Sequence, residues 1–313
     1  MKSLSNNIYD YYVAHFSTLP FDKQLHFASR LFLWSGDSFG ARQLELLRPQ
    51  VTLHDQPAEA LRAVYAEAMQ TIYHGSKNAA SLRAPYFQKY PELRALATVL
   101  FRLTFLKTIY GQDATTTFFE LFKQEQVETL LERLQADTKA LAILSTHAVN
   151  VLYLYGRVAC SSEDIFDPAL FLKVGATSYN LDDPLELQLY IYLYTHCIIG
   201  ESKFYARAIP EEYWPVYSTM LDELEACITK RFSMINLDNK CEFLVCCKLT
   251  NRTSNLEARI FAEAEESVSE DGVFLVDRHN TNPQTTNSSL DLSEHRNVLY
   301  ILAHRSFTPQ ADR

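Results

Sequence analysis

The chain has 313 residues, of which 47% are apolar, so it is long and apolar enough to fold around a large core. Its formal net charge of −9 argues against broad nucleic-acid binding, because that binding needs Lys and Arg to displace the counterions of the phosphates. The chain has only 8 glycines, and they form no glycine-rich phosphate-binding loop. These features predict a globular protein that does not bind nucleic acid.

The sequence also bears on location and on bound groups. It contains no uninterrupted apolar run of about 18 residues, the length that spans a membrane, and its polar N-terminal segment does not resemble a signal peptide. The 6 cysteines lie mostly among bulky apolar residues, as buried free thiols do, and their spacing is not that of a zinc site. We therefore expect a cytoplasmic protein with no metal, no cofactor and no membrane partner.

Apolar residues recur at helical spacing along nearly the whole chain. The segment 211–232 is the clearest case, with steps of three and four between Trp214, Tyr217, Leu221, Leu224 and Ile228. The best strand candidate, Val273–Val276, is short and isolated. The pattern predicts an all-α fold.

Six strongly apolar helices alternate with more polar, amphipathic segments such as 115–134 and 253–268. The apolar helices are predicted to begin near Phe21, Pro91, Asp137, Pro184, Asp238 and Asp291, at intervals of about 70, 46, 47, 54 and 53 residues. Such alternation is typical of stacked helical hairpins. Six pairs are enough to close a ring, so we predict an (α/α)6-type toroid, with an open α-solenoid as the alternative.

Two short motifs add a family resemblance. Glu270–Phe274, between an amphipathic and an apolar helix, resembles the D-G-x-aromatic turn of α/α-toroid proteins such as terpene cyclases and prenyltransferases. The stretches 193–205 and 237–243 are similar to an uncharacterised bacterial all-helical family. The resemblance implies the toroid fold. It does not imply cyclase chemistry, because the chain lacks the D-x-D-D and D-D-x-x-D motifs.

The domain organisation follows from the absence of a linker. No composition shift divides the chain, so we predict one helical-hairpin domain over residues 1–313. The only long polar stretch, 276–290, contains Pro283 and is predicted to be a loop or flap. It precedes the sixth apolar helix, so in a closed ring it could cross one mouth.

Polar residues that interrupt the apolar helices are the candidates for a functional site. Residues four apart share a helix face, so these side chains form stripes that would line the axis of a toroid. Histidine can act as a general base near neutral pH, a glutamate can orient it, and arginine can bind a carboxylate or phosphate. The candidate catalytic residues are His147, His196, Glu242 and His295, and the candidate ligand-binding residues are His26, Arg94, Arg102, Asn150 and Tyr192.

Structural alternatives exist for many of these polar residues. Acids such as Asp22, Asp238 and Asp291 lie where first helical turns are expected, and there an acid favourably caps the helix. The arginines can equally pair with buried acids. The sequence has no H-E-x-x-H motif and no G-x-S-x-G elbow, so it predicts neither a metal site nor a nucleophilic serine.

Polar stripes without a recognisable catalytic constellation predict a protein that binds a small anionic or peptide-like ligand in an axial cavity. One alternative is a toroid enzyme, a lyase, hydrolase or cyclase with His/Glu acid–base chemistry. That alternative requires two of the polar groups to converge within about 3–6 Å. The other alternative is a protein–protein scaffold with an open concave face.

Overall fold

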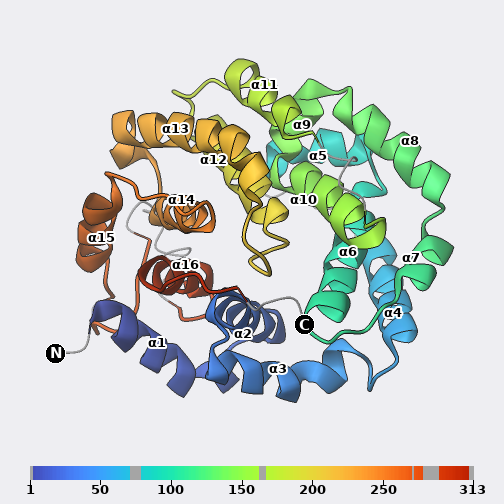
Figure 1. The fold of residues 1–313 in the computed structure, drawn as a ribbon, viewed down its shortest axis with the longest axis horizontal. Helices are drawn as coiled ribbons and strands as arrows, with labels where there is room; N and C mark the ends of the chain where they lie inside the picture. Colours follow the sequence, from blue (N-terminus) through green and yellow to red (C-terminus); the bar gives the residue numbers. More distant parts are fainter. Residues whose placement is uncertain (1–2, 71–78, 162–166, 270, 278–288, 310–313) are drawn as a thin grey trace. The chain divides into compact units, whose positions relative to one another are not determined.

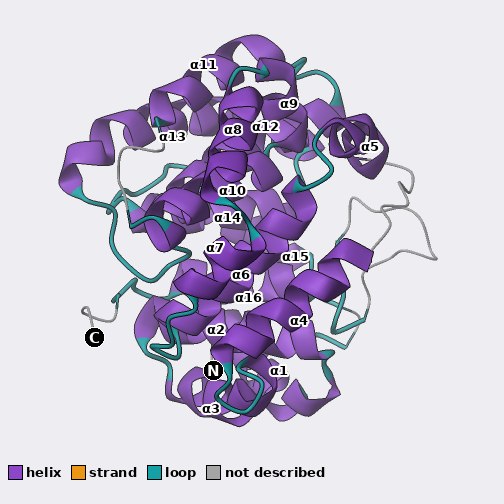
Figure 2. Cartoon of the chain, turned by 90° about the vertical axis from the view of Figure 1, so that its right-hand side faces the viewer, coloured by secondary structure: helices purple, strands orange, loops and turns teal. Residues whose placement is uncertain are grey.

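The computed structural model describes residues 3–70, 79–161, 167–269, 271–277 and 289–309. Within these ranges the chain folds into α-helices joined by loops and short 3-10 and π segments (Figure 1 and Figure 2). The best strand candidate, at 273–276, takes part only in one isolated bridge, between Val268 and Leu275. The predicted all-α class is therefore confirmed. Most of the predicted loop 276–290 lies outside the described residues.

The described helices divide into two compact units. The first unit comprises Met1–Leu46 and Phe204–Arg313, and the second comprises Leu47–Lys203. One helix, α3 (Ser38–Val51), runs across this division. The predictions of a single domain, a closed toroid or an open solenoid concern how such parts combine, and they stay predictions.

Three of the predicted apolar helices form one layer of the first unit. They are α2 (Phe21–Ser35), α14 (Leu237–Leu249) and α16 (Glu294–His304), and α16 packs against both of the others. Three more exposed helices pack on this layer: α1 (Leu4–Ala14), α13 (Trp214–Lys230) and α15 (Glu257–Glu266). Because α14 and α16 have neighbours on several sides, they are buried on nearly every face, and most of their polar residues are buried too.

The second unit repeats the arrangement. Its apolar layer consists of α6 (Leu93–Thr108), α10 (Thr146–Leu154) and α12 (Pro184–Glu201), with α10 packed between the other two. The remaining helices are α4 (Pro57–Gln70), α5 (Ala79–Lys89), α7 (Thr115–Leu121), α8 (Gln124–Gln135), α9 (Thr138–Leu144) and α11 (Pro168–Ser178). As predicted, Pro184 occupies the first turn of α12, and Asp183 caps it by accepting from two backbone N–H groups.

The apolar helix predicted from Asp137 is broken by Ser145. This residue has φ 37° and ψ −100°, a strained conformation for a residue with a side chain, and its hydroxyl accepts from the N–H of Thr146. The break separates α9 from α10 and places His147 in the first turn of α10. At the other end, α10 continues into a π-helical segment, Tyr155–Ala159.

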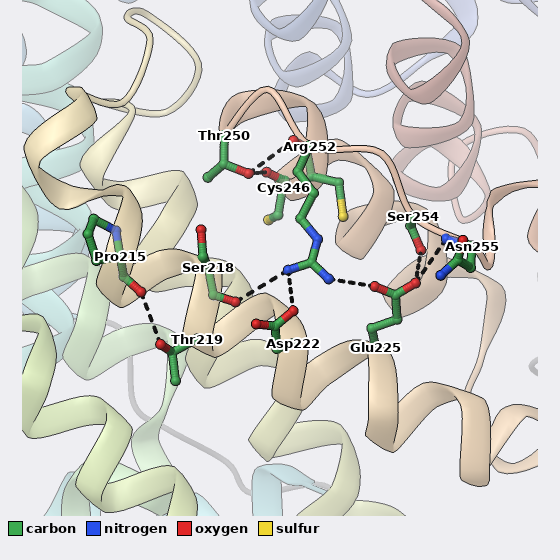
Figure 3. Close-up of polar contacts among 11 residues, drawn as sticks. Pro215, Ser218, Thr219, Asp222, Glu225, Cys246, Thr250, Arg252, Ser254 and Asn255 are labelled. Atoms are coloured by element: carbon green, nitrogen blue, oxygen red, sulfur yellow. Dashed lines mark hydrogen bonds and ion pairs between the residues drawn. The ribbon is translucent and has the colours of Figure 1, made fainter.

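An ion-pair network fastens the loop after α14 to α13 in the first unit (Figure 3). Arg252 contacts the carboxylates of Asp222 and Glu225, each at 2.6 Å. Glu225 also accepts from the Ser254 hydroxyl and from the N–H of Asn255, both at 2.9 Å. One carboxylate therefore fixes both the arginine and the backbone that leads into α15.

Candidate functional site

Five polar residues predicted from the sequence lie on the three adjacent apolar helices of the second unit. We call them the α10 cluster: Arg94 on α6, His147 and Asn150 on α10, and Tyr192 and His196 on α12. Apart from the buried Asn150, their side chains are partly exposed. The packing of α10 between α6 and α12 thus brings together residues that are up to about a hundred positions apart in the chain.

The cluster contains a direct contact between two predicted residues. His196 Nδ1 lies 2.8 Å from Asn150 Oδ1, and because an amide oxygen only accepts, the imidazole donates from Nδ1. Tyr192, one turn earlier on α12, places its ring 6.1 Å from that of His196, and its hydroxyl accepts from Gln188 at 3.3 Å. The side chains of α12 and α10 therefore hold His196 in a defined orientation.

His147 lies in a cationic environment. Its ring packs edge-on against Phe87 with centroids 5.1 Å apart, and the guanidinium of Arg94 lies 5.7 Å from the centroid of the same phenyl ring. Burial lowers the pKa of His147 to about 4, and the charges of Arg83 and Arg94 act in the same direction, opposed by a hydrogen bond to the backbone of Leu144. At neutral pH this imidazole is uncharged.

Arg102 lies in a different place from Arg94. The two residues are separated by about 12 Å along α6, since each residue adds about 1.5 Å. Arg102 Nη1 donates to the carbonyl of Val51 at 2.6 Å, where α3 ends, and burial lowers its pKa. The predicted pair of arginines is therefore not brought together in the second unit, and Arg102 has a structural partner of its own.

The first unit holds a second polar group around the N-terminus of α16. We call it the α16 cluster: His26 on α2, Asp238 on α14, and Glu294, His295 and Arg296 on α16. His26 Nδ1 lies 2.8 Å and 3.0 Å from the two carboxylate oxygens of Glu294, and the rings of His26 and His295 are 5.5 Å apart. The predicted residues His26 and His295 thus converge.

Arg296 and Asp238 form the other half of the α16 cluster. Arg296 Nη2 donates to Asp238 Oδ2 at 3.0 Å, and the arginine side chain is only 1% exposed. Its Nε and Nη1 atoms, and Asp238 Oδ1, are buried without a hydrogen-bond partner among the described residues. Burial raises the pKa of Asp238, although the charge of Arg296 opposes this. Asn297 ties the cluster to the preceding loop by pairing with both backbone groups of Leu275.

Glu242, predicted to orient a catalytic histidine, belongs to neither of the two clusters. It is on α14 in the core of the first unit, where it is 1% exposed, whereas His147 and His196 belong to the second unit. Its charge acts on Tyr205, on whose ring the guanidinium of Arg30 stacks at 4.6 Å.

The sequence interpretation missed Glu294 and Arg296. Asp291 and His295 are four residues apart and would share a face of one helix, but α16 begins at Glu294, so Asp291 lies in the turn before the helix. The available signal was the string Glu294–Arg296 itself, because three consecutive polar residues at the start of an apolar helix cannot all face solvent when every side of the helix is covered.

Comparisons with known proteins identify neither a family nor a related structure for this chain. No family model, no curated protein and no solved structure matches the chain. In the described part of the chain, no three His, Cys, Asp or Glu side chains are placed to hold a metal ion, and none of the described helices could cross a membrane. The functional argument therefore depends on the two clusters.

Proposed function

We propose that the protein binds a small anionic molecule at the α10 cluster. The observation that supports this is the shared contact of Phe87 with the Arg94 guanidinium and the His147 imidazole, at 5.7 Å and 5.1 Å. A partly exposed guanidinium beside an uncharged imidazole suits a carboxylate or a phosphate, because the cation supplies charge and the neighbouring side chains supply hydrogen bonds.

The charges around His147 support the same assignment. The two charged side chains that act on its pKa, Arg83 and Arg94, are both cations and come from neighbouring helices, α5 and α6. A bound anion would relieve their repulsion and favour the imidazolium form of His147. Asn150 and His196 add hydrogen-bonding groups on the adjoining helices. The site lies within one unit and does not depend on closure of the chain into a toroid.

The proposal is tested by calorimetric titration of the purified protein with inorganic phosphate, acetate, succinate and citrate at constant ionic strength. We expect at least one of these anions to bind and to stabilise the fold, by about 2.7 kcal/mol at a hundred times its Kd. The variant Arg94→Met should remove binding. The matched control, Arg102→Met on the same helix, should retain it, because Arg102 contacts the Val51 carbonyl instead.

A second readout separates binding at this site from nonspecific stabilisation. NMR titration of His147 should show its pKa rising from about 4 when the anion is present, since a nearby negative charge favours the protonated ring. A panel in which no anion binds would contradict the proposal. Binding that survives Arg94→Met, or that leaves the titration of His147 unchanged, would contradict it equally.

A further inference from the structure

The strongest polar contact of the α16 cluster joins two residues 268 positions apart. Both carboxylate oxygens of Glu294 lie within hydrogen-bond distance of His26 Nδ1, at 2.8 Å and 3.0 Å. The side chain of Glu294 is 0% exposed, and that of His26 is 26% exposed. A fully buried carboxylate therefore holds an imidazole that still reaches solvent.

The position of Glu294 explains how a buried carboxylate is stabilised there. It is the first residue of α16, where the partial positive charge of the helix N-terminus favours an anion. Lys23 on α2 adds an ammonium group whose Nζ lies 3.8 Å from Glu294 Oε2. Both groups favour an anion at this position, and a carboxylate is the form that accepts a hydrogen bond from an imidazole.

This contact determines which nitrogen of His26 is available. Because Glu294 accepts, the proton of the neutral ring lies on Nδ1, and the lone pair lies on Nε2. Nε2 makes no hydrogen bond with the described residues. In the Ser-His-Asp triads of hydrolases, a buried carboxylate on Nδ1 likewise fixes the tautomer and orientation of the histidine that acts as the base. His26 has that arrangement without a nucleophilic serine.

Several other polar side chains lie near His26 in the α16 cluster and in the turn before α16. The ring of His295 lies 5.5 Å from that of His26, and Lys23 precedes His26 by three residues on the same face of α2. Asp291 lies in the turn before α16, and the Arg296–Asp238 pair lies on the α14 side of the cluster. A base with an ammonium group and a second imidazole beside it suits a reaction in which negative charge develops on an oxygen.

We propose that His26 is a general base that activates water for hydrolysis of a small carboxylic ester, independently of anion binding at the α10 cluster. Nε2 of His26 takes a proton from water while the water oxygen bonds to the carbonyl carbon. The bond from that carbon to the leaving oxygen then breaks, and the imidazolium returns its proton to the alcohol or phenol that leaves. Lys23 stabilises the oxyanion. Glu294 remains a carboxylate throughout and acts as a positioning residue.

The test is turnover of p-nitrophenyl acetate by the full chain. We expect repeated turnover, a loss of about a hundredfold or more in His26→Asn, and a smaller loss in Glu294→Gln with an altered pH dependence of the remaining rate. His15→Asn is the matched control, because His15 is an exposed histidine of the same unit whose Nδ1 also donates, to the Tyr11 carbonyl at 2.9 Å. It should leave the rate unchanged.

A measurement on the unaltered protein keeps the proposal testable if Glu294→Gln does not fold. The 15N chemical shifts of the His26 ring should report a proton on Nδ1 and none on Nε2 in the neutral form. A proton on Nε2 would overturn the proposal. Turnover that His26→Asn leaves unchanged, or that His15→Asn lowers equally, would show the His26–Glu294 pair to be structural only.

Discussion

The two units have the same construction but place their histidines in opposite environments. Each contains three adjacent, largely buried helices with more exposed helices packed on them. In the second unit His147 faces the cations Arg83 and Arg94, whereas in the first unit His26 faces the carboxylate of Glu294. The same residue type on equivalent layers is thus suited to different tasks, to hydrogen bonding beside a bound anion in one unit and to proton transfer in the other.

The two units also differ in how deeply they bury the carboxylate of an arginine–carboxylate ion pair. Arg157 and Glu201 in the second unit lie 3.0 Å apart, with side chains only 3% and 1% exposed. The corresponding pair in the first unit, Arg296 and Asp238, is also 3.0 Å apart, but the carboxylate is 19% exposed. Because water can still reach Asp238, we expect the loss of the arginine to lower stability less in the Arg296–Asp238 pair than in the Arg157–Glu201 pair.

The largest predicted effect tests this difference. Arg157→Met removes the cation that lies 3.0 Å from the buried Glu201 carboxylate, which should lower the free energy of unfolding by about 3–5 kcal/mol in urea denaturation. Arg296→Met should have a smaller effect, because Asp238 keeps some contact with solvent. Adding Glu201→Leu to Arg157→Met should restore part of the loss. Equal losses for the two arginine variants would remove the distinction between the pairs.

The second prediction concerns pH and the cationic environment of His147. Its pKa of about 4 lies below the ordinary histidine value of 6.5, so on acidification the unfolded chain takes up a proton before the folded chain does. The folded state should therefore lose about 3 kcal/mol of stability between pH 7 and pH 4 through this residue. Above pH 7 the ring is neutral in both states and contributes no pH dependence.

The variant His147→Gln should show a smaller loss of stability over the same pH range. His15→Gln in the first unit is the control, because that side chain is exposed and its removal should leave the pH profile unchanged. Chemical denaturation at a series of pH values measures both. Identical profiles for wild type and His147→Gln would contradict the neutral, cation-flanked histidine on which the comparison of the units depends.

The sequence predicted the helices better than it predicted the contacts between them. The spacing of apolar residues is a local property, and it located all six apolar helices, although α6 and α16 begin a few residues late. The break at Ser145 was not predicted, because one small polar residue scarcely changes an apolar helical pattern. The pairing of His26 with Glu294 was not predicted either, since it depends on packing between segments 268 positions apart.

Arg94 and Arg102 illustrate the same limit. Their spacing of two four-residue steps on one helix predicted one stripe with one role. In the structure Arg94 stacks on Phe87 while Arg102 binds the Val51 carbonyl, because α6 meets different neighbours along its length. Periodicity shows which face of a helix a residue occupies. The role of that residue depends on the helices that pack against the face.

The smallest predicted effect concerns the Arg252 network of the first unit (Figure 3). Arg252 is 24% exposed, and its partners differ, since Asp222 is 70% exposed and Glu225 only 15%. Exposed ion pairs contribute about 0–1 kcal/mol, so Asp222→Asn should scarcely change the free energy of unfolding. Glu225→Ala should lower it by about 1–2 kcal/mol, because it also removes the oxygen that accepts from Ser254 and Asn255. Urea denaturation of the two variants measures the difference, and equal effects would show that the network acts through charge alone rather than by holding the loop before α15.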